Sequence, residues 1–230
     1  MRQPPYYLAV GATRNEEEDI IPVRQTLVIT GYLGCIGISV FAVVLVIMAT
    51  PAAEEEKSKY ISEGMEAHCG WSVMVLGSCS FLIFICQFAA GVHMNRHCAI
   101  LFSMMQLLGW NVVLGVVDTG WNLHYMGLCA FLLGNIGYHW IASRDPNYGN
   151  EGYQWVNRLT IFFTCVFCCT AGSNILLAEK MGSTSQRELK AVAVSLEFVL
   201  FFFGMLENML LVRALDRYEN IHLVFERKML

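Results

Sequence analysis

Residues 26–50 read TLVITGYLGCIGISVFAVVLVIMAT and contain no charged side chain. A helix needs about 20 mostly apolar residues to cross the hydrocarbon core of a bilayer. This stretch is therefore long and apolar enough to form a transmembrane helix. Five later stretches have the same character and are also expected to span the membrane, at about residues 70–92, 98–117, 120–142, 155–178 and 189–212.

The composition agrees with a membrane protein. Of the 230 residues 56% are hydrophobic and 15% are charged, whereas a soluble domain has about 25% charged residues. The charges lie in short clusters between the apolar stretches, a pattern that excludes a soluble enzyme and a disordered chain. The net charge of −4, with no Lys/Arg-rich run, excludes a nucleic-acid binder. We expect an all-α polytopic protein: a polar tail at 1–25, a bundle of six transmembrane helices at 26–212 and a short tail at 213–230.

The basic residues predict how the chain sits in the membrane, because cytosolic loops carry an excess of Lys and Arg. With the amino terminus in the cytosol, that side holds ten basic residues and the opposite side holds five. The cytosolic set is Arg2, Arg14, Arg24, Arg96, Arg144, Arg158, Arg213, Arg217, Arg227 and Lys228, and the other is Lys57, Lys59, Lys180, Arg187 and Lys190. Both termini are therefore expected to be cytosolic.

A few ionisable residues interrupt the apolar spans. They are His124, His139, Glu197 and Glu207, with Asp118 at the entrance of the fourth span, and the spans also contain the uncharged Asn111, Asn135, Asn174 and Asn208. Ionisable groups at membrane depth cost at least about 2.5 kcal/mol near the centre and mark functional candidates. Two interpretations stay open for them: hydrogen bonds between helices, or a direct role in handling a ligand, lipid or proton.

Other patterns predict packing rather than chemistry. His93, His97 and Cys98 have a spacing that metal ligands use, but a basic turn at the interface explains them better, so we predict no metal site and no cofactor. Gly31, Gly34 and Gly37 form a small-residue stripe that lets another helix approach closely, within the chain or from a second copy.

Two stretches resemble the DRAM family, the damage-regulated autophagy modulators. Tyr60-Ile61-Ser62-Glu63-Gly64 in the first outer loop is similar to the family's Tyr-Ile-Ser-Asp-Thr-Gly, although Met65-Glu66 stands where the family has Pro-Pro-Glu. The fourth span resembles the family's in its order of His, Gly and aromatic residues, which in this chain are His124, Gly127, Phe131 and Tyr138.

This resemblance implies a non-enzymatic, multi-pass regulator or adaptor linked to autophagy. It implies a lysosomal or other endomembrane location, with the plasma membrane as the alternative. Relatives in the wider superfamily include adaptors for a phosphoinositide kinase and factors that remodel lipid anchors. The departure at Met65-Glu66 leaves the branch open.

The carboxyl-terminal tail contains a candidate sorting signal. Tyr218-Glu-Asn-Ile221 fits the tyrosine-based pattern that a sorting adaptor would bind, and an amphipathic turn is the alternative. The other expected partners are membrane lipids and proteins in the membrane.

Three other functions stay open. The first is lipid remodelling, with Asp118, His124 and Glu197 near the outer face. The second is a channel or transporter that uses Glu197 and Glu207 along a pathway. The third is a structural subunit of a larger membrane complex.

Overall fold

Each predicted span becomes one helix in the computed structural model, which describes residues 6–9, 19–22, 24–49, 69–115, 121–176, 183–217 and 221–225. The helices within these ranges are α1 (Arg24–Ala49), α3 (Cys69–His93), α4 (His97–Gly115), α5 (Trp121–Ala142), α6 (Glu151–Leu176) and α7 (Ser183–Leu215). A helical membrane-type bundle is thus confirmed. The family-like stretch from Tyr60 to Glu66 lies outside the described residues, as do Asp118 and Tyr218.

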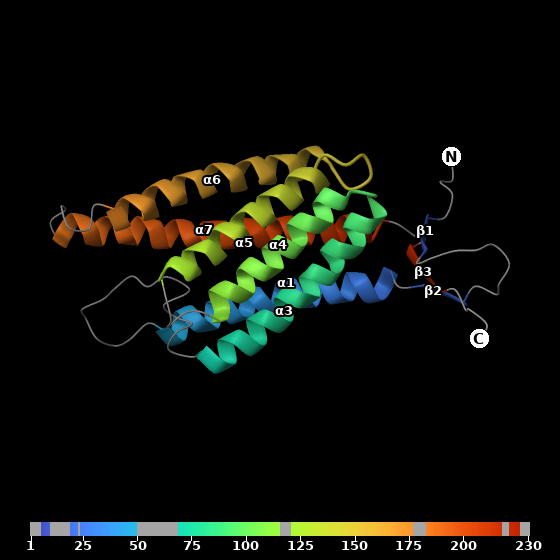
Figure 1. Cartoon of the computed structure of the whole chain (residues 1–230), viewed down its shortest axis with the longest axis horizontal. Helices are drawn as coiled ribbons and strands as arrows, with labels where there is room; N and C mark the ends of the chain where they lie inside the picture. Colours follow the sequence, from blue (N-terminus) through green and yellow to red (C-terminus); the bar gives the residue numbers. More distant parts are fainter. Residues whose placement is uncertain are drawn as a thin grey trace.

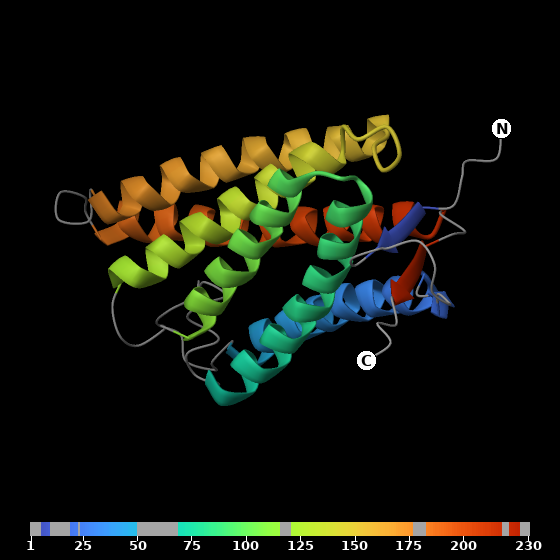
Figure 2. The ribbon, with the colours of Figure 1, turned by 45° about the vertical axis from the view of Figure 1, so that its right-hand side comes forward.

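Successive helices run up and down the bundle (Figure 1). The start of α1, the α3–α4 turn, the α5–α6 turn and the end of α7 lie at one end, which we call the basal end (Figures 1 and 2). A salt bridge of 2.9 Å between Arg24 Nη2 and Asp216 Oδ1 joins the first and last helices there. The chain therefore enters and leaves the bundle on the same side.

Five of the described helices are long and apolar enough to cross a membrane, namely α1, α3, α4, α6 and α7. Helix α5 is not among them, because its side chains His124, Asn135 and His139 lower its mean hydropathy. Asn135 and His139 point inward and are at most 6% exposed, whereas Met126, Leu133 and Trp140 form an exposed apolar stripe at seven-residue spacing. The polar side chains Asn135 and His139 of α5 therefore face the inside of the bundle, while its exposed stripe is apolar.

Close helix packing depends on glycines in two places. A Cβ atom on Gly134 of α5 would meet the backbone of Phe102 and Gln106 on α4, and one on Gly109 of α4 would meet the backbone of α5. On α1, the predicted stripe packs inside the chain: Gly31 faces Val212, while Gly34 and Gly37 face α3. The stripe therefore packs against other helices of the same chain.

Three short strands lie beyond the basal end, and the sequence did not indicate them. β1 (Tyr6–Ala9), β2 (Asp19–Pro22) and β3 (Ile221–Phe225) form a sheet in the order β1-β3-β2. β3 pairs in parallel with β1 and antiparallel with β2, and Ile221 is opposite Tyr6. The two tails are therefore held together outside the bundle, and one residue of the predicted sorting signal lies in the sheet.

Candidate functional site

Six buried polar side chains gather inside the bundle, among apolar residues. Each is at most 9% exposed. They are Gln87 on α3, Gln106 on α4, Asn135 on α5, Asn157 on α6, and Glu207 and Asn208 on α7. We call these six residues the polar layer.

Glu207 is the centre of this layer. Its Oε1 accepts a hydrogen bond from Asn157 Nδ2 at 2.8 Å, and its Oε2 accepts one from Asn135 Nδ2 at 3.1 Å. Gln106 Nε2 extends the chain of bonds by donating to Asn135 Oδ1 at 3.0 Å. One carboxyl group and three amides thereby connect four helices, α4 to α7.

A second branch includes α3. Gln87 Nε2 donates to Asn208 Oδ1 at 2.9 Å, and Asn208 Nδ2 donates to the Gly204 carbonyl on its own helix at 2.8 Å. Tyr138 donates from its hydroxyl to the Gln87 carbonyl at 2.9 Å. With this branch, five helices are tied at a single level of the bundle.

The depth of the layer follows from helix geometry alone. Every member lies six to nine residues from the end of its helix at the basal end. At 1.5 Å per residue this places the layer about 9–13 Å inside that end. A hydrocarbon core of about 30 Å that starts at the basal end would contain the layer nearer to that end.

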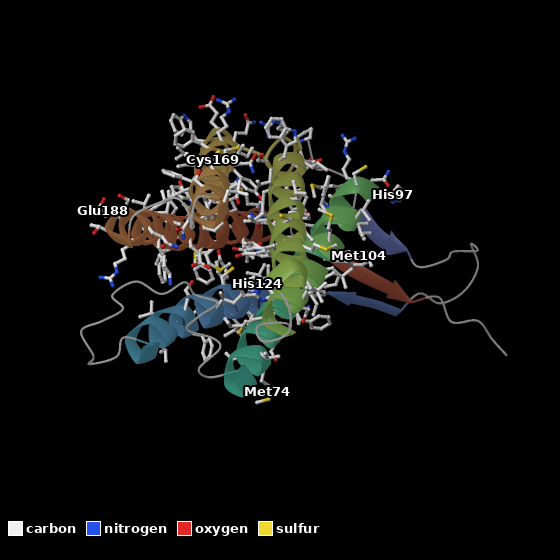
Figure 3. The ribbon with its side chains drawn as sticks, turned by 60° about the vertical axis from the view of Figure 1, so that its left-hand side comes forward. Met74, His97, Met104, His124, Cys169 and Glu188 are labelled. Carbon is white, nitrogen blue, oxygen red and sulfur yellow. The ribbon has the colours of Figure 1, made fainter. Side chains whose placement is uncertain are left out.

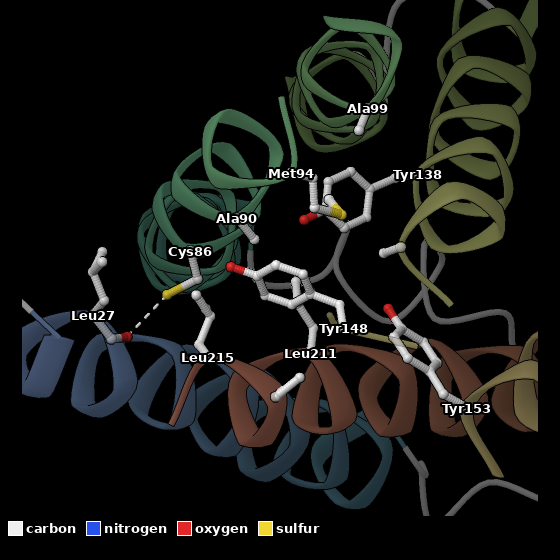
Figure 4. Packing of buried hydrophobic residues seen from close by; sticks show 12 residues of the cluster. Leu27, Cys86, Ala90, Met94, Ala99, Tyr138, Tyr148, Tyr153, Leu211 and Leu215 are labelled. Carbon is white, nitrogen blue, oxygen red and sulfur yellow. Dashed lines mark hydrogen bonds between the residues drawn. The ribbon is translucent and has the colours of Figure 1, made fainter. Parts of the chain in front are cut away.

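Aromatic side chains fill the space between the polar layer and the basal end. Tyr138, Tyr148 and Tyr153 are fully buried there (Figure 4). The Tyr153 hydroxyl bonds His139 Nδ1 at 2.5 Å, and the Tyr148 hydroxyl bonds His93 Nδ1 at 2.8 Å. In the same region Cys86 Sγ donates to the Leu27 carbonyl at 3.0 Å, which joins α3 to α1 (Figure 4). The basal end is thus closed by side chains that bond one another.

Some buried atoms in the layer and beside it keep hydrogen-bonding capacity. Among the described residues, Gln106 Oε1, Asn157 Oδ1 and His139 Nε2 are buried and have no partner. A buried polar atom without a partner costs about 1–3 kcal/mol. The layer therefore couples helices strongly but is not fully satisfied by protein groups.

The structure places the predicted intramembrane residues in two groups. Glu207 and His139 lie in or beside the polar layer and are fully buried. Glu197 on α7 and His124 on α5 are half-buried and lie about 27 Å from the basal end, at similar depths. The family-like Gly127 is buried against Val112 of α4, and Phe131 packs on Trp110 with ring centroids 5.0 Å apart.

Half of the layer was not predicted from the sequence. Gln87, Gln106 and Asn157 are not among the predicted polar candidates, although the amides Asn135 and Asn208 are. Asn111 is a predicted candidate, but it is exposed and donates to Leu107 on its own helix at 2.8 Å. What distinguishes these amides is the face of the helix on which they lie, because those on the inner face bond to other helices.

The predicted basic turn has no metal-like arrangement in the described part of the chain. His97 and Cys98 are exposed, while His93 bonds Tyr148. No group of three or more His, Cys, Asp or Glu side chains that could hold a metal ion occurs within the described ranges.

Comparison with known protein families, with curated proteins and with solved structures finds no match to this chain.

Proposed function

We propose that this chain is a non-enzymatic, six-span membrane regulator or adaptor of the DRAM type, acting in lysosomal or related endomembranes. The observation that carries the proposal is the polar layer. Its carboxyl and amide groups are used in hydrogen bonds between helices, which stabilise a scaffold instead of lining a reaction site. The family-like stretches at Tyr60 to Gly64 and from His124 to Tyr138 support the same proposal.

The proposed topology has six spans with both termini in the cytosol. Helix α5 supports a sixth span because its polar side chains face inward and its exposed stripe is apolar. The described basal end carries Arg24, Arg96, Arg144, Arg213 and Arg217, and an excess of basic residues marks the cytosolic side. A scaffold with short loops and two tails on the cytosolic side suits an adaptor that binds partners through these tails.

Purification of the tagged full chain from native membranes in mild detergent tests the proposal. We expect defined partner proteins to co-purify, and we expect the Tyr60→Ala/Ile61→Ala variant to lose at least one of them. Purified chain that converts a lipid substrate without partners, or that conducts ions in liposomes, would overturn the adaptor proposal.

The proposed location has its own test. Substituting Tyr218→Ala is expected to shift a fluorescently tagged chain from endomembranes to the cell surface. Recognition of this segment would also require β3 to separate from β1, because Ile221 pairs with Tyr6 in the sheet. An unchanged distribution would remove the sorting signal from the proposal and leave the adaptor function standing.

A further inference from the structure

Two arginines lie on the α5–α6 side of the basal end. Arg144 is the second residue after α5, and Arg158 begins the third turn of α6. Burial lowers the pKa of Arg144, and the nearby charge of Arg158 lowers it further. Like charges held near one another are unfavourable unless an anion lies between them.

Arg144 is held in place by the end of α5 and the residue before it. Its Cζ lies 3.2 Å from the ring centroid of Trp140, and its Nη1 donates to the Trp140 carbonyl at 3.1 Å and to Ser143 Oγ at 3.3 Å. A guanidinium group has five N–H donors in a rigid fork. Several donors therefore stay available on a side chain whose direction is already fixed.

Arg158 lies on the outer surface of α6. Trp155 and Phe162, which flank it on the same helix face, are 61% and 59% exposed. Arg158 itself is exposed and makes no hydrogen bond or ion pair in the described part of the structure. Its helix position is about 10 Å from the basal end, a depth at which an arginine reaches toward phosphate or water.

Of the two acidic residues near this pair in the sequence, Asp145 is engaged in the turn. Asp145 Oδ1 accepts the backbone N–H groups of Asn147 at 2.9 Å and Tyr148 at 3.4 Å. Glu151 is exposed on the first turn of α6, where its charge suits the helix dipole. The turn between the helices is fixed by these bonds and by the Tyr148–His93 bond.

We propose that Arg144 and Arg158 form a binding site for the headgroup of an anionic phospholipid. The phosphate lies between the two guanidinium groups, and Trp140 and Trp155 flank it at the level where aromatic residues line membrane interfaces. The acyl chains lie deeper along the exposed Phe162 of α6 and Leu133 of α5. The site uses neither the polar layer nor the sorting segment, but it rests on the proposed cytosolic orientation of the basal end.

Brominated lipids test the site, because bromine quenches nearby tryptophan fluorescence. The full chain is reconstituted in phosphatidylcholine nanodiscs with increasing amounts of brominated phosphatidylserine. We expect quenching to saturate at a low mole fraction in the natural chain. The Arg144→Gln/Arg158→Gln variant is expected to need about tenfold more of the anionic lipid. Brominated phosphatidylcholine is expected to show no saturation with either protein.

A matched control separates a defined site from general charge. Arg213→Gln/Arg217→Gln removes the same charge from the same end of the bundle, and it is expected to keep the half-saturating fraction of the natural chain. Arg158→Gln alone removes a side chain that has no hydrogen bond or ion pair in the described structure, so it is expected to fold normally and to weaken binding about threefold.

Three results would overturn the proposal. They are unchanged quenching in both Arg158 variants, an equal loss in the Arg213→Gln/Arg217→Gln control, and displacement of the lipid by millimolar inorganic phosphate, which would point to a free anion as the ligand.

Discussion

Glu207 places a carboxyl group about 12 Å inside the bundle, with amides as its partners. Bringing a polar group to this depth costs free energy, and each hydrogen bond between membrane helices returns only about 0.6–2 kcal/mol. A single bond would leave the group unfavourable. Its two bonds to Asn135 and Asn157 explain why the fold tolerates it and why those amides occur on the inner faces of α5 and α6.

Substituting Glu207→Ala is expected to lower the free energy of unfolding by about 2–4 kcal/mol, because two amide donors lose their acceptor inside the bundle. Glu207→Gln keeps the volume of the side chain but turns an N–H group toward one of the two amide donors. We therefore expect the free energy of unfolding to fall by about 1–2 kcal/mol. Titration with sodium dodecyl sulfate, followed by helical circular dichroism, measures both. The exposed Glu188→Gln on the same helix serves as control, and equal stability of Glu207→Ala and this control would show that the layer is not an energetic tie.

Helices α4 and α5 approach one another through residues without side chains. The Gly109, Gly127 and Gly134 positions all face backbone or rigid β-branched side chains of the other helix, which cannot move aside. Small residues at such contacts allow close van der Waals packing, the main attraction between helices in lipid. The same approach brings Gln106 to Asn135, so the glycine seam also positions the polar layer.

Gly134→Ala is expected to cost about 1–3 kcal/mol of unfolding free energy, because the new methyl group meets the backbone of α4. Gly172→Ala on α6 is the matched control: a Cβ there meets nothing within 4 Å, so we expect no loss or a gain of about 0.5–1 kcal/mol. Thermal unfolding in detergent compares the two. A Gly134→Ala protein as stable as Gly172→Ala would contradict the tight seam.

The apolar stretches predict where helices cross the membrane better than where they end. The last span is expected at 189–212, but α7 extends over Ser183–Leu215, because polar residues such as Gln186 and Glu188 continue a helix without adding hydropathy. Similarly, α6 begins at Glu151, where Asn150 Oδ1 accepts the Tyr153 N–H and caps the first turn. Hydropathy predicts which segments lie in the membrane, while the ends of the helices depend on local hydrogen bonds.

The partners inside the bundle could not be predicted from the sequence for a different reason. Glu207 and His139 stand out as polar residues in apolar runs, and both are buried. Their partners Asn157 and Tyr153 depend on the rotation and register of α6 against α5 and α7, which a single sequence does not encode in any short pattern. The strand pairing of Tyr6 with Ile221 is equally non-local.

At the scale of the whole molecule, both tails lie beyond one end of the bundle. Arg24 and Asp216 bond across the first and last helices, but their side chains are 31% and 53% exposed. An exposed ion pair contributes about 0–1 kcal/mol and is screened by salt. The common location of the tails therefore rests on the up-and-down order of the helices and on the three-stranded sheet.

Asp216→Asn is accordingly expected to change the free energy of unfolding by less than about 0.5 kcal/mol, since solvent already screens the pair. The same detergent titration in low and high salt measures it. A loss of several kcal/mol would instead make this ion pair the main link between the first and last helices.

The orientation of the bundle in the membrane can be tested by labelling one native and one introduced cysteine at opposite ends. Cys98 is exposed next to His97 at the basal end, and Glu188 is exposed near the start of α7 at the far end (Figure 3). Two variants are compared: a Glu188→Cys chain that lacks the native cysteines, and a chain that retains only Cys98. If the termini are cytosolic, a membrane-impermeant maleimide added to intact cells should label the first variant at the cell surface and should not label the second. In sealed endomembrane vesicles with the cytosolic face outward, the pattern should reverse, and permeabilisation should expose both positions. Labelling of Cys98 from the non-cytosolic side would invert the proposed topology and would place the arginine pair in the opposite leaflet, where anionic phospholipid is scarce.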